Sequence, residues 1–209
     1  MADASRRGRF ITLEGVDGAG KSTHIPWIAQ RLRDAGRRVV VTREPGGTPL
    51  AEKLRALVLA ERMDPLAETL LIFAARADHA RQVIAPALER GEWVVCDRFG
   101  DATIAYQGAG NGVSESLIGR LAQAAHGALK PDRTFFFDCS YEVSRTRLAA
   151  AARALDRFES EDQAFFERVR AAYMQIARDE PGRVKRIDGG ASIEQIRNEL
   201  ERNLDFESS

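Results

Sequence analysis

The stretch Gly15-Val16-Asp17-Gly18-Ala19-Gly20-Lys21-Ser22 decides how this chain is interpreted, and it directly follows the apolar run Phe10-Ile11-Thr12-Leu13. It matches the phosphate-binding loop pattern G-x-x-x-x-G-K-[ST] at every fixed position. Small residues let successive backbone N–H groups converge on phosphate oxygens, Lys21 supplies a positive charge to the β- and γ-phosphates, and the Ser22 hydroxyl is a ligand for Mg²⁺. We therefore expect these eight residues and Thr23 to bind ATP, with Lys21 as a catalytic residue.

The segments on either side of this loop agree with that interpretation. A strand leads into it, and Ile25, Ile28 and Leu32 recur at helical spacing in a helix expected from about Lys21 to Ala35, ending at Gly36. The alternative is a glycine-rich turn without a ligand. The agreement of strand, motif and helix favours phosphate binding.

Four further apolar runs predict strands, and long helical patterns separate them. They are 39–42, 93–96, 134–137 and, with a weaker pattern, 183–187. Strands that alternate with helices predict an α/β fold with a five-stranded parallel sheet and helices on both faces. Ligands of such sheets bind beyond the carboxyl ends of the strands, so chemistry is expected there.

Composition limits the classes of protein to which the chain can belong. It has 209 residues, 44% hydrophobic and 30% charged, which suits a single domain over 1–209. Lys plus Arg equals Asp plus Glu at 31 each, so no overall charge favours nucleic acid or a membrane as partner. No apolar run approaches the ~18 residues of a membrane span, and the sequence favours a cytoplasmic protein. Cys96 and Cys139 end apolar runs and are expected to be structural thiols.

Charged residues follow the second and third expected strands. Arg43-Glu44-Pro45-Gly46-Gly47-Thr48 places a cation and a carboxylate at the ligand edge, where Arg43 either contacts phosphate or belongs to a simple connection. Asp97 and Arg98 follow the third strand. Asp97 either holds Mg²⁺ or caps a helix, and Arg98 is placed to clamp a phosphate. The expected metal ligands are Ser22, Asp97 and Glu44.

Two expected helices carry further candidates. In the helix from about 49 to 60, Arg55 lies either on a solvated face or toward the ligand. The helix from about 65 to 90 is apolar around most of its first half, which favours a second subunit packed on it and a homodimer. Phe73 and Arg76 share a face, suited either to a base or, for Phe73, to core packing.

The segments near 103 and 150 complete the set of candidates. Thr103, Tyr106 and Gln107 share one helical face, which we expect to end at the glycines 108, 110 and 112. The arginine- and alanine-rich segment at about 147–157 is either a mobile lid over a nucleotide or an ordinary solvated helix. The helices at about 162–178 and 192–204 are expected only to cover the sheet.

These features together resemble thymidylate kinases, P-loop enzymes that phosphorylate dTMP, over nearly the whole chain. The resemblance is carried by segments 14–23 (EGVDGAGKST), 42–48 (TREPGGT), 73–76 (FAAR), 96–99 (CDRF), 105–108 (AYQG) and 155–159 (LDRFE). It implies ATP-dependent phosphorylation of dTMP to dTDP in dTTP biosynthesis by a homodimeric P-loop kinase that uses Mg²⁺.

The resemblance also implies residue roles. Asp17 would face the sugar of dTMP, and Arg43, Arg55 and Arg98 would gather around its phosphate. Phe73 would stack on the thymine and Arg76 would bond its edge, while Thr103 and Gln107 would assist in recognising the base. Tyr106 would crowd the 2′ position of the sugar. Many members have the stacking aromatic four residues before the arginine, where this chain has Ile72. At the position of Phe99, members have Tyr or His more often than Phe. Members without an arginine at the position of Gly18 supply one from the lid, which here implies Arg153 or Arg147 at ATP. The implied catalytic residues are Lys21, Arg153, Arg98 and Asp17.

The implied reaction is in-line phosphoryl transfer without a covalent intermediate. Positioning and charge neutralisation supply the rate, because the acceptor phosphate oxygens are already ionised. One alternative is a kinase for another small acceptor, such as a deoxynucleoside. The other is a nucleotide switch or motor subunit whose hydrolysis drives a partner.

Overall fold

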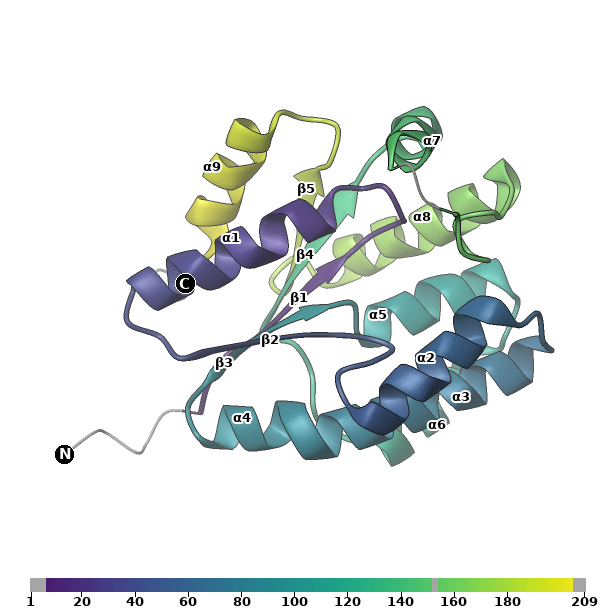
Figure 1. Cartoon of the computed structure of the whole chain (residues 1–209), viewed down its shortest axis with the longest axis horizontal. Helices are drawn as coiled ribbons and strands as arrows, with labels where there is room; N and C mark the ends of the chain where they lie inside the picture. The colour runs from purple at the N-terminus through teal and green to yellow at the C-terminus, as the bar shows by residue number, and fades with distance from the viewer. Residues whose placement is uncertain (1–6, 152–153, 205–209) are drawn as a thin grey trace.

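The structure is a computed structural model that describes residues 7–151 and 154–204, and it is built on a parallel sheet (Figure 1). The strands are β1 (Phe10–Glu14), β2 (Val39–Arg43), β3 (Trp93–Asp97), β4 (Arg133–Asp138) and β5 (Val184–Asp188). Their order is β2-β3-β1-β4-β5, and every neighbouring pair is parallel. The five strands and the α/β fold class predicted from sequence are confirmed.

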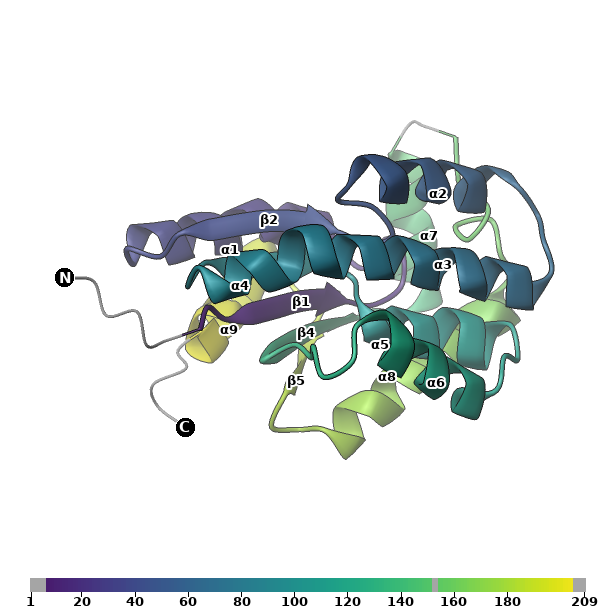
Figure 2. The ribbon, with the colours of Figure 1, turned by 90° about the horizontal axis from the view of Figure 1, so that it is seen from below.

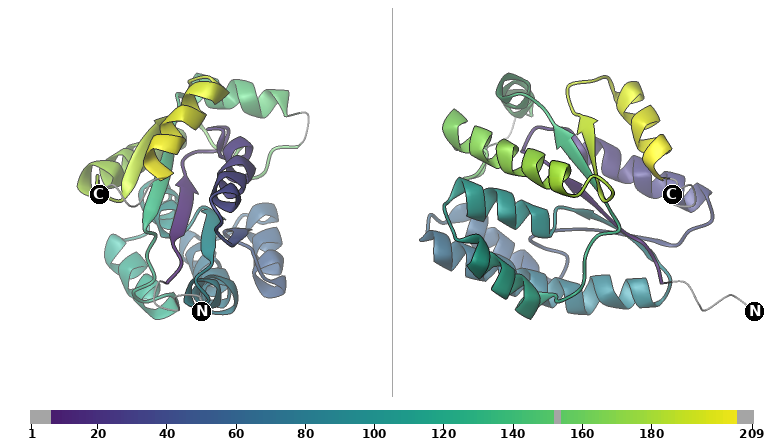
Figure 3. Two further views of the ribbon diagram at one scale, coloured as in Figure 1. Left: turned by 90° about the vertical axis from the view of Figure 1, so that its left-hand side faces the viewer. Right: turned by 180° about the vertical axis from the view of Figure 1, so that it is seen from behind.

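Helical segments lie between the strands and after β5. They are α1 (Lys21–Asp34), α2 (Pro49–Ala60), α3 (Pro65–His79), η1 (Ala80–Ile84), α4 (Ala85–Glu89), α5 (Gly100–Thr103), η2 (Ile104–Gly110), α6 (Glu115–Ala125), α7 (Tyr141–Ala150), α8 (Gln163–Asp179) and α9 (Ile193–Leu204). Helices α1 and α9 cover one face of the sheet, and α4 and α8 cover the other (Figures 2 and 3). In the described part of the chain, no helix is long and apolar enough to cross a membrane.

The sheet positions the ligand edge because its central strands are buried on both faces. Every residue of β1 and β4 is buried, and Phe135, Phe136 and Phe137 are among the largest fully buried side chains. The register pairs Asp97 with both Leu13 and Arg43, so the carboxyl ends of β1, β2 and β3 are level. The polar residues that follow these strands therefore emerge at one edge.

The expected helix at 65–90 and the helical segment around 103–107 each contain a π-helical part. The first is formed by α3, η1 and α4, and the second by α5 and η2. The prediction that Gly108 and Gly110 break the second helix was wrong, because both lie inside η2. A Cβ at Gly110 would meet the Phe165 ring at 2.6 Å, so this glycine lets α8 pack closely on η2. Only Gly112, at φ +77°, lies beyond the helix end, and α6 after it was not anticipated.

Both cysteines behave as the sequence predicted. Cys96 and Cys139 are free thiols, 0% and 4% exposed. Burial is the main cause that raises the pKa of each thiol. They are structural side chains, and neither pairs in a disulfide with the other.

Candidate active site

The phosphate-binding loop connects β1 to α1 in a conformation that needs its glycines. Gly15, Gly18 and Gly20 have φ values of +131°, +75° and +102°, which side chains rarely adopt. A Cβ would stand 2.3 Å from the Phe137 carbonyl oxygen at Gly15 and 2.7 Å from that of Ser144 at Gly18. Helix α1 begins directly at Lys21, so the free N–H groups of its first turn face the loop.

Lys21 is folded against this loop. Its Nζ donates hydrogen bonds of 3.0 Å to the carbonyl oxygens of Gly15 and Val16, and the residue is 7% exposed. Burial, followed by the charge of Arg98, lowers the pKa of the Lys21 ammonium. The ammonium group therefore lies at the phosphate-binding loop, where the motif predicts it.

Arg147 reaches the same loop from α7. Its Nη1 lies 3.3 Å from the carbonyl oxygens of both Gly18 and Ala19. Arg153, the other candidate lid arginine, lies outside the described residues. Of the two arginines, the described part of the chain thus places Arg147 beside the loop.

Arg98 joins the loop to the neighbouring cavity. Its backbone has φ +69°, and its N–H donates to the Leu13 carbonyl at 3.0 Å. Its guanidinium donates to the Gly15 carbonyl at 2.8 Å and to Asp17 Oδ1 at 2.7 Å, and it lies over the Tyr106 ring. Burial raises the pKa of the Asp17 carboxyl, but the charges of Arg98 and Lys21 outweigh burial, and the pKa falls to about 2. Asp17 is therefore ionised at neutral pH.

Glu14 and Tyr173 support Arg98 from behind, and sequence reasoning missed both. Tyr173 OH donates to Glu14 Oε2 at 2.8 Å and accepts from Arg98 Nη1 at 3.2 Å, while Glu14 Oε1 accepts from the Phe99 N–H at 2.7 Å. Burial, then the charge of Asp101, raises the pKa of Glu14 to about 8. The expectation that α8 holds no site residue was wrong. The available signal was helical spacing, since Tyr173 follows the buried Val169 by four residues.

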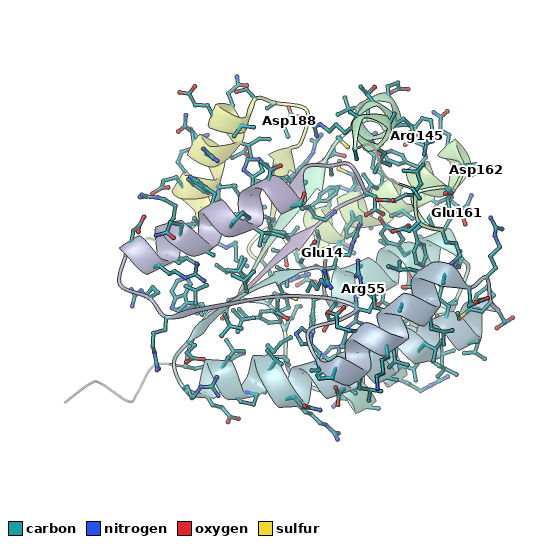
Figure 4. The ribbon with its side chains drawn as sticks, in the orientation of Figure 1. Glu14, Arg55, Arg145, Glu161, Asp162 and Asp188 are labelled. Atoms are coloured by element: carbon teal, nitrogen blue, oxygen red, sulfur yellow. The ribbon has the colours of Figure 1, made fainter. Side chains whose placement is uncertain are left out.

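A cavity beside the loop brings together most of the predicted acceptor residues, and we call it the acceptor cavity. Its lining residues are Asp17, Glu44, Pro45, Arg55, Val58, Leu59, Ile72, Arg76, Arg98, Phe99, Ala102, Thr103, Tyr106, Gln107, Asp156 and Phe158. Arg55 extends toward it from α2, where its Nη1 donates to the Pro45 carbonyl at 3.0 Å (Figure 4). Burial is the main cause that lowers the pKa of Arg55. Arg55 therefore does not belong to a purely solvated face.

Two predicted acceptor residues lie outside this cavity. Phe73 instead lines a second cavity of about 830 Å³, together with residues of α5 and α6, and Ile72 occupies the acceptor side. The assignment of Phe73 to base stacking was therefore wrong for this cavity. Arg43 forms an exposed ion pair with Glu52 at 2.8 Å, and it does not line the acceptor cavity.

Glu44 has a different role from the predicted metal ligand. Its Oε2 accepts from Arg76 Nε at 2.6 Å and its Oε1 is bonded to His79 Nδ1 at 2.9 Å, with the carboxylate 2% exposed. Burial raises the pKa of Glu44, but the Arg76 charge and the His79 hydrogen bond outweigh it and the pKa is lowered. Both carboxylate oxygens are engaged, so the prediction that Glu44 is a metal ligand is replaced. Glu44 instead positions Arg76.

Asp97 is the carboxylate that suits a metal ion. Its Oδ1 is buried and has no hydrogen-bond partner in the described chain. A buried unpaired oxygen is costly unless a ligand satisfies it. No group of three or more His, Cys, Asp or Glu that could hold a metal occurs among residues 7–151 and 154–204, so protein carboxylates alone do not form a cage.

The segment after α7 lies over the acceptor cavity. Asp156 and Phe158 line that cavity, and the Phe158 ring meets Tyr106 edge-on at 5.7 Å between centroids. Arg157 donates to Glu68 Oε2 at 2.6 Å and to the Val58 carbonyl at 3.0 Å. Asp156, near the end of the lid expected at about 147–157, and Phe158, just beyond it, therefore lie at the acceptor cavity.

A phosphate-binding loop at the carboxyl edge of a five-stranded parallel sheet, with an arginine-containing cavity beside it, defines a P-loop kinase of a small acceptor. A sequence model of the thymidylate kinase family matches residues 13–200. The chain belongs to this family. It is an enzyme that catalyses the ATP-dependent phosphorylation of dTMP to dTDP.

Individual relatives agree with the family assignment. The chain is 58% identical to a thymidylate kinase of Bordetella pertussis over 195 residues, 93% of each chain. It is 53% identical to that of Ralstonia nicotianae over 201 residues, 94% of this chain and 98% of the relative. The crystal structure of thymidylate kinase from Ehrlichia chaffeensis matches with a TM-score of 0.77 at 35% identity, covering 95% of this chain and 98% of the other.

Proposed function

We propose that this enzyme transfers the γ-phosphoryl group of ATP in line to a phosphate oxygen of dTMP bound in the acceptor cavity. The observation that carries the proposal is the position of Asp17, which belongs to the phosphate-binding loop and also lines the acceptor cavity. Donor and acceptor phosphates would therefore meet beside one residue. The acceptor oxygen is already ionised, so positioning and charge neutralisation provide the catalysis.

On the donor side, the loop from Gly15 to Thr23 binds the ATP phosphates. The N–H groups at the start of α1 hold the phosphate oxygens, and Lys21 exchanges its contacts with the carbonyls of Gly15 and Val16 for β- and γ-phosphate oxygens. Arg147, next to Gly18 and Ala19, adds a second cation, and Arg153 is the proposed lid arginine.

On the acceptor side, Arg98 and Arg55 bind the phosphate of dTMP. Arg98 already holds Asp17, so an incoming phosphate joins a preformed cluster of charges. Tyr106 donates to Asp17 Oδ2 at 2.9 Å, which places its ring beside the sugar end of the cavity. Arg76, Thr103 and Gln107 form the base end.

Magnesium fits the residues between the two sides. The unpaired Asp97 Oδ1 and the Ser22 hydroxyl are oxygen donors of the kind that Mg²⁺ binds, directly or through water. When bound, Mg²⁺ neutralises charge on the ATP phosphates. Asp97 and Ser22 would hold and orient it.

A panel of nucleoside monophosphates assayed with ATP and Mg²⁺ tests this function. We expect ADP release that depends on dTMP and gives stoichiometric dTDP. ADP release that is independent of any acceptor would favour a nucleotide switch, and a preference for uncharged deoxynucleosides would contradict the role of Arg55 and Arg98.

The proposal includes a homodimer in the cytoplasm, where ATP and dTMP are available as charged solutes. Helices α2 and α3 expose Leu50, Leu57, Leu66 and Leu70, which are 44–50% exposed in the single chain. Sedimentation velocity should give the mass of two chains, and a Leu66→Arg, Leu70→Arg double variant should sediment as one. The same change at the exposed Val41 of β2 serves as the control. A wild-type chain that sediments as a monomer at micromolar concentration contradicts the dimer.

A further inference from the structure

Glu68 is a buried carboxylate at the base end of the acceptor cavity. It lies on α3 and is 1% exposed. Its Oε1 accepts from Gln107 Nε2 at 2.7 Å and from Asn111 Nδ2 at 3.0 Å, and its Oε2 accepts from Arg157 Nη2 at 2.6 Å. One side chain therefore connects η2, the residue that follows it, and the segment over the cavity.

The contact with Glu68 determines which end of the Gln107 amide faces the cavity. An ionised carboxylate only accepts hydrogen bonds, so the amide nitrogen of Gln107 must face Glu68. Gln107 lines the acceptor cavity, and no residue of the described chain donates a hydrogen bond to its Oε1. Gln107 thus presents an acceptor to a bound base.

Arg76, which lines the acceptor cavity and the second cavity, keeps one donor without a partner. Its Nε is held by Glu44 and its Nη2 donates to the Phe99 carbonyl at 3.0 Å, while its buried Nη1 has no partner among the described residues. A guanidinium cannot accept a hydrogen bond. Thr103 Oγ1, also buried and unpartnered, can act either way. The residues that line the base end therefore include one side chain that can only donate, Arg76, and one that keeps a free acceptor, Gln107.

The pyrimidine bases differ in which of their edge positions donate and which accept hydrogen bonds. Thymine and uracil offer a carbonyl acceptor at position 4 and a donor at N3–H, whereas cytosine offers an amino donor at position 4 and an acceptor at N3. A protein acceptor that faces N3 accepts a hydrogen bond from the N3–H of thymine or uracil. The same acceptor meets another acceptor, N3, when the base is cytosine. Discrimination is strong when an incorrect ligand leaves buried polar groups unpaired.

We propose that Glu68 is a positioning residue that fixes the polarity of Gln107 and thereby makes the acceptor cavity select thymine and uracil over cytosine. This inference rests on the proposed binding of dTMP in the acceptor cavity. Glu68 touches no substrate and acts through Gln107.

The variant Glu68→Gln tests the proposal with little change of shape. Arg157 can only donate, so it takes the oxygen of the new amide and leaves the amide nitrogen facing Gln107 and Asn111. Gln107 must then turn over and present its nitrogen to the cavity. We expect the ratio of kcat/KM for dTMP to that for dCMP to fall by roughly tenfold to a hundredfold.

Two controls distinguish a reversed Gln107 amide from a general loosening of the acceptor cavity. The dTMP to dUMP ratio should stay unchanged in Glu68→Gln, because these bases share the same edge at positions 3 and 4. The variant Arg157→Gln removes a partner of Glu68 but keeps the Gln107 contact, so its dTMP to dCMP ratio should match wild type. If dCMP turnover is too slow, its inhibition constant against dTMP replaces kcat/KM.

The outcomes are distinguishable. A wild-type enzyme that does not phosphorylate dTMP contradicts the proposed function itself. An active wild type with an unchanged dTMP to dCMP ratio in folded Glu68→Gln overturns the role of Glu68, as does a fall of both ratios together. If Glu68→Gln does not fold, Glu68→Asp retracts the carboxylate from Gln107 while keeping its charge, and an unchanged ratio there also overturns the proposal.

Discussion

Arg98 is the residue at which the donor and acceptor halves of the site meet. Its positive φ is uncommon for a side-chain-bearing residue, and such strain costs on the order of 1–3 kcal/mol. The Leu13 carbonyl on one side and Glu14, through Phe99 N–H, on the other hold this turn in place. The conformation directs the guanidinium back to Gly15 and Asp17, where both phosphates are proposed to lie.

Lys21→Ala should remove most phosphoryl transfer. The change deletes the ammonium that is proposed to meet the β- and γ-phosphates. Lys21 is buried and bonded to two loop carbonyls, so a modest loss of stability accompanies the loss of turnover. The measurements are kcat with saturating dTMP and a thermal melt. Near-normal turnover in a folded variant would exclude the phosphate-binding role of this loop.

Tyr106→Ala should narrow the difference in kcat/KM between dTMP and its ribose analogue. The ring is proposed to lie against the sugar and leave no room for a 2′-hydroxyl. Tyr106→Phe is the matched control, because it keeps the ring and removes only the hydroxyl that bonds to Asp17. We expect Phe to retain most of the discrimination. If Ala leaves the ratio unchanged, sugar selection resides in another residue.

At the scale of elements, η2 and the segment after α7 form the acceptor cavity together. Tyr106 and Gln107 of η2 both line the cavity. Phe158 packs on Tyr106 and Arg157 bonds to Glu68 of α3. These two contacts attach the segment to η2 and to α3.

The segment after α7 is also predicted to supply the lid arginine. Gly18 leaves Lys21 as the one long cation of the loop, so an arginine from the segment after α7 should meet the charge of the moving phosphoryl group. Such arginines are worth roughly 10³–10⁵ in rate. Arg153→Ala should lower kcat by a factor of about 100 or more with little change in dTMP affinity, and Arg147→Ala should do less.

Steady-state kinetics and dTMP titration of both variants provide the measurement. A larger defect in Arg147→Ala would show that the lid arginine lies about two helical turns before position 153. Arg147, which contacts Gly18 and Ala19, would then be the lid arginine. No defect in either variant would mean that the donor-side charge is supplied by another group.

At the scale of the whole molecule, Glu14 should make stability depend on pH. Burial and the charge of Asp101 raise its pKa from 4.5 to about 8, while Arg98, Tyr173 and Phe99 N–H oppose the rise. The folded state then binds a proton that the unfolded state releases between these values. The contribution of Glu14 is therefore fully present below about pH 4.5 and is lost as the pH rises through about 8.

Glu14→Gln should flatten this dependence, because glutamine does not ionise. Urea unfolding at pH 5, 6.5 and 8 would measure it. The free energy of unfolding of wild type should fall relative to that of the variant across this range. Equal slopes for the two proteins would contradict protonation of Glu14 in the folded state.

The sequence by itself determined the features that depend on local pattern. The phosphate-binding loop, the five strands and the principal helices follow from residue types and spacings within a few positions, and the motifs identified the family. Arg98, Asp17, Tyr106, Arg76 and Gln107 could be assigned to one site because their segments follow the strands or match family motifs.

Only the tertiary structure decided which side chains face the acceptor cavity and what orients them. Ile72 and Phe73 differ by about 100° around α3, and short-range spacing does not tell which of the two is turned inward. The contacts Glu44 to Arg76, Glu68 to Gln107 and Glu14 to Tyr173 join residues that are 32, 39 and 159 positions apart. These contacts form because folding buries each carboxylate, and a buried carboxylate requires partners that the chain brings from distant elements.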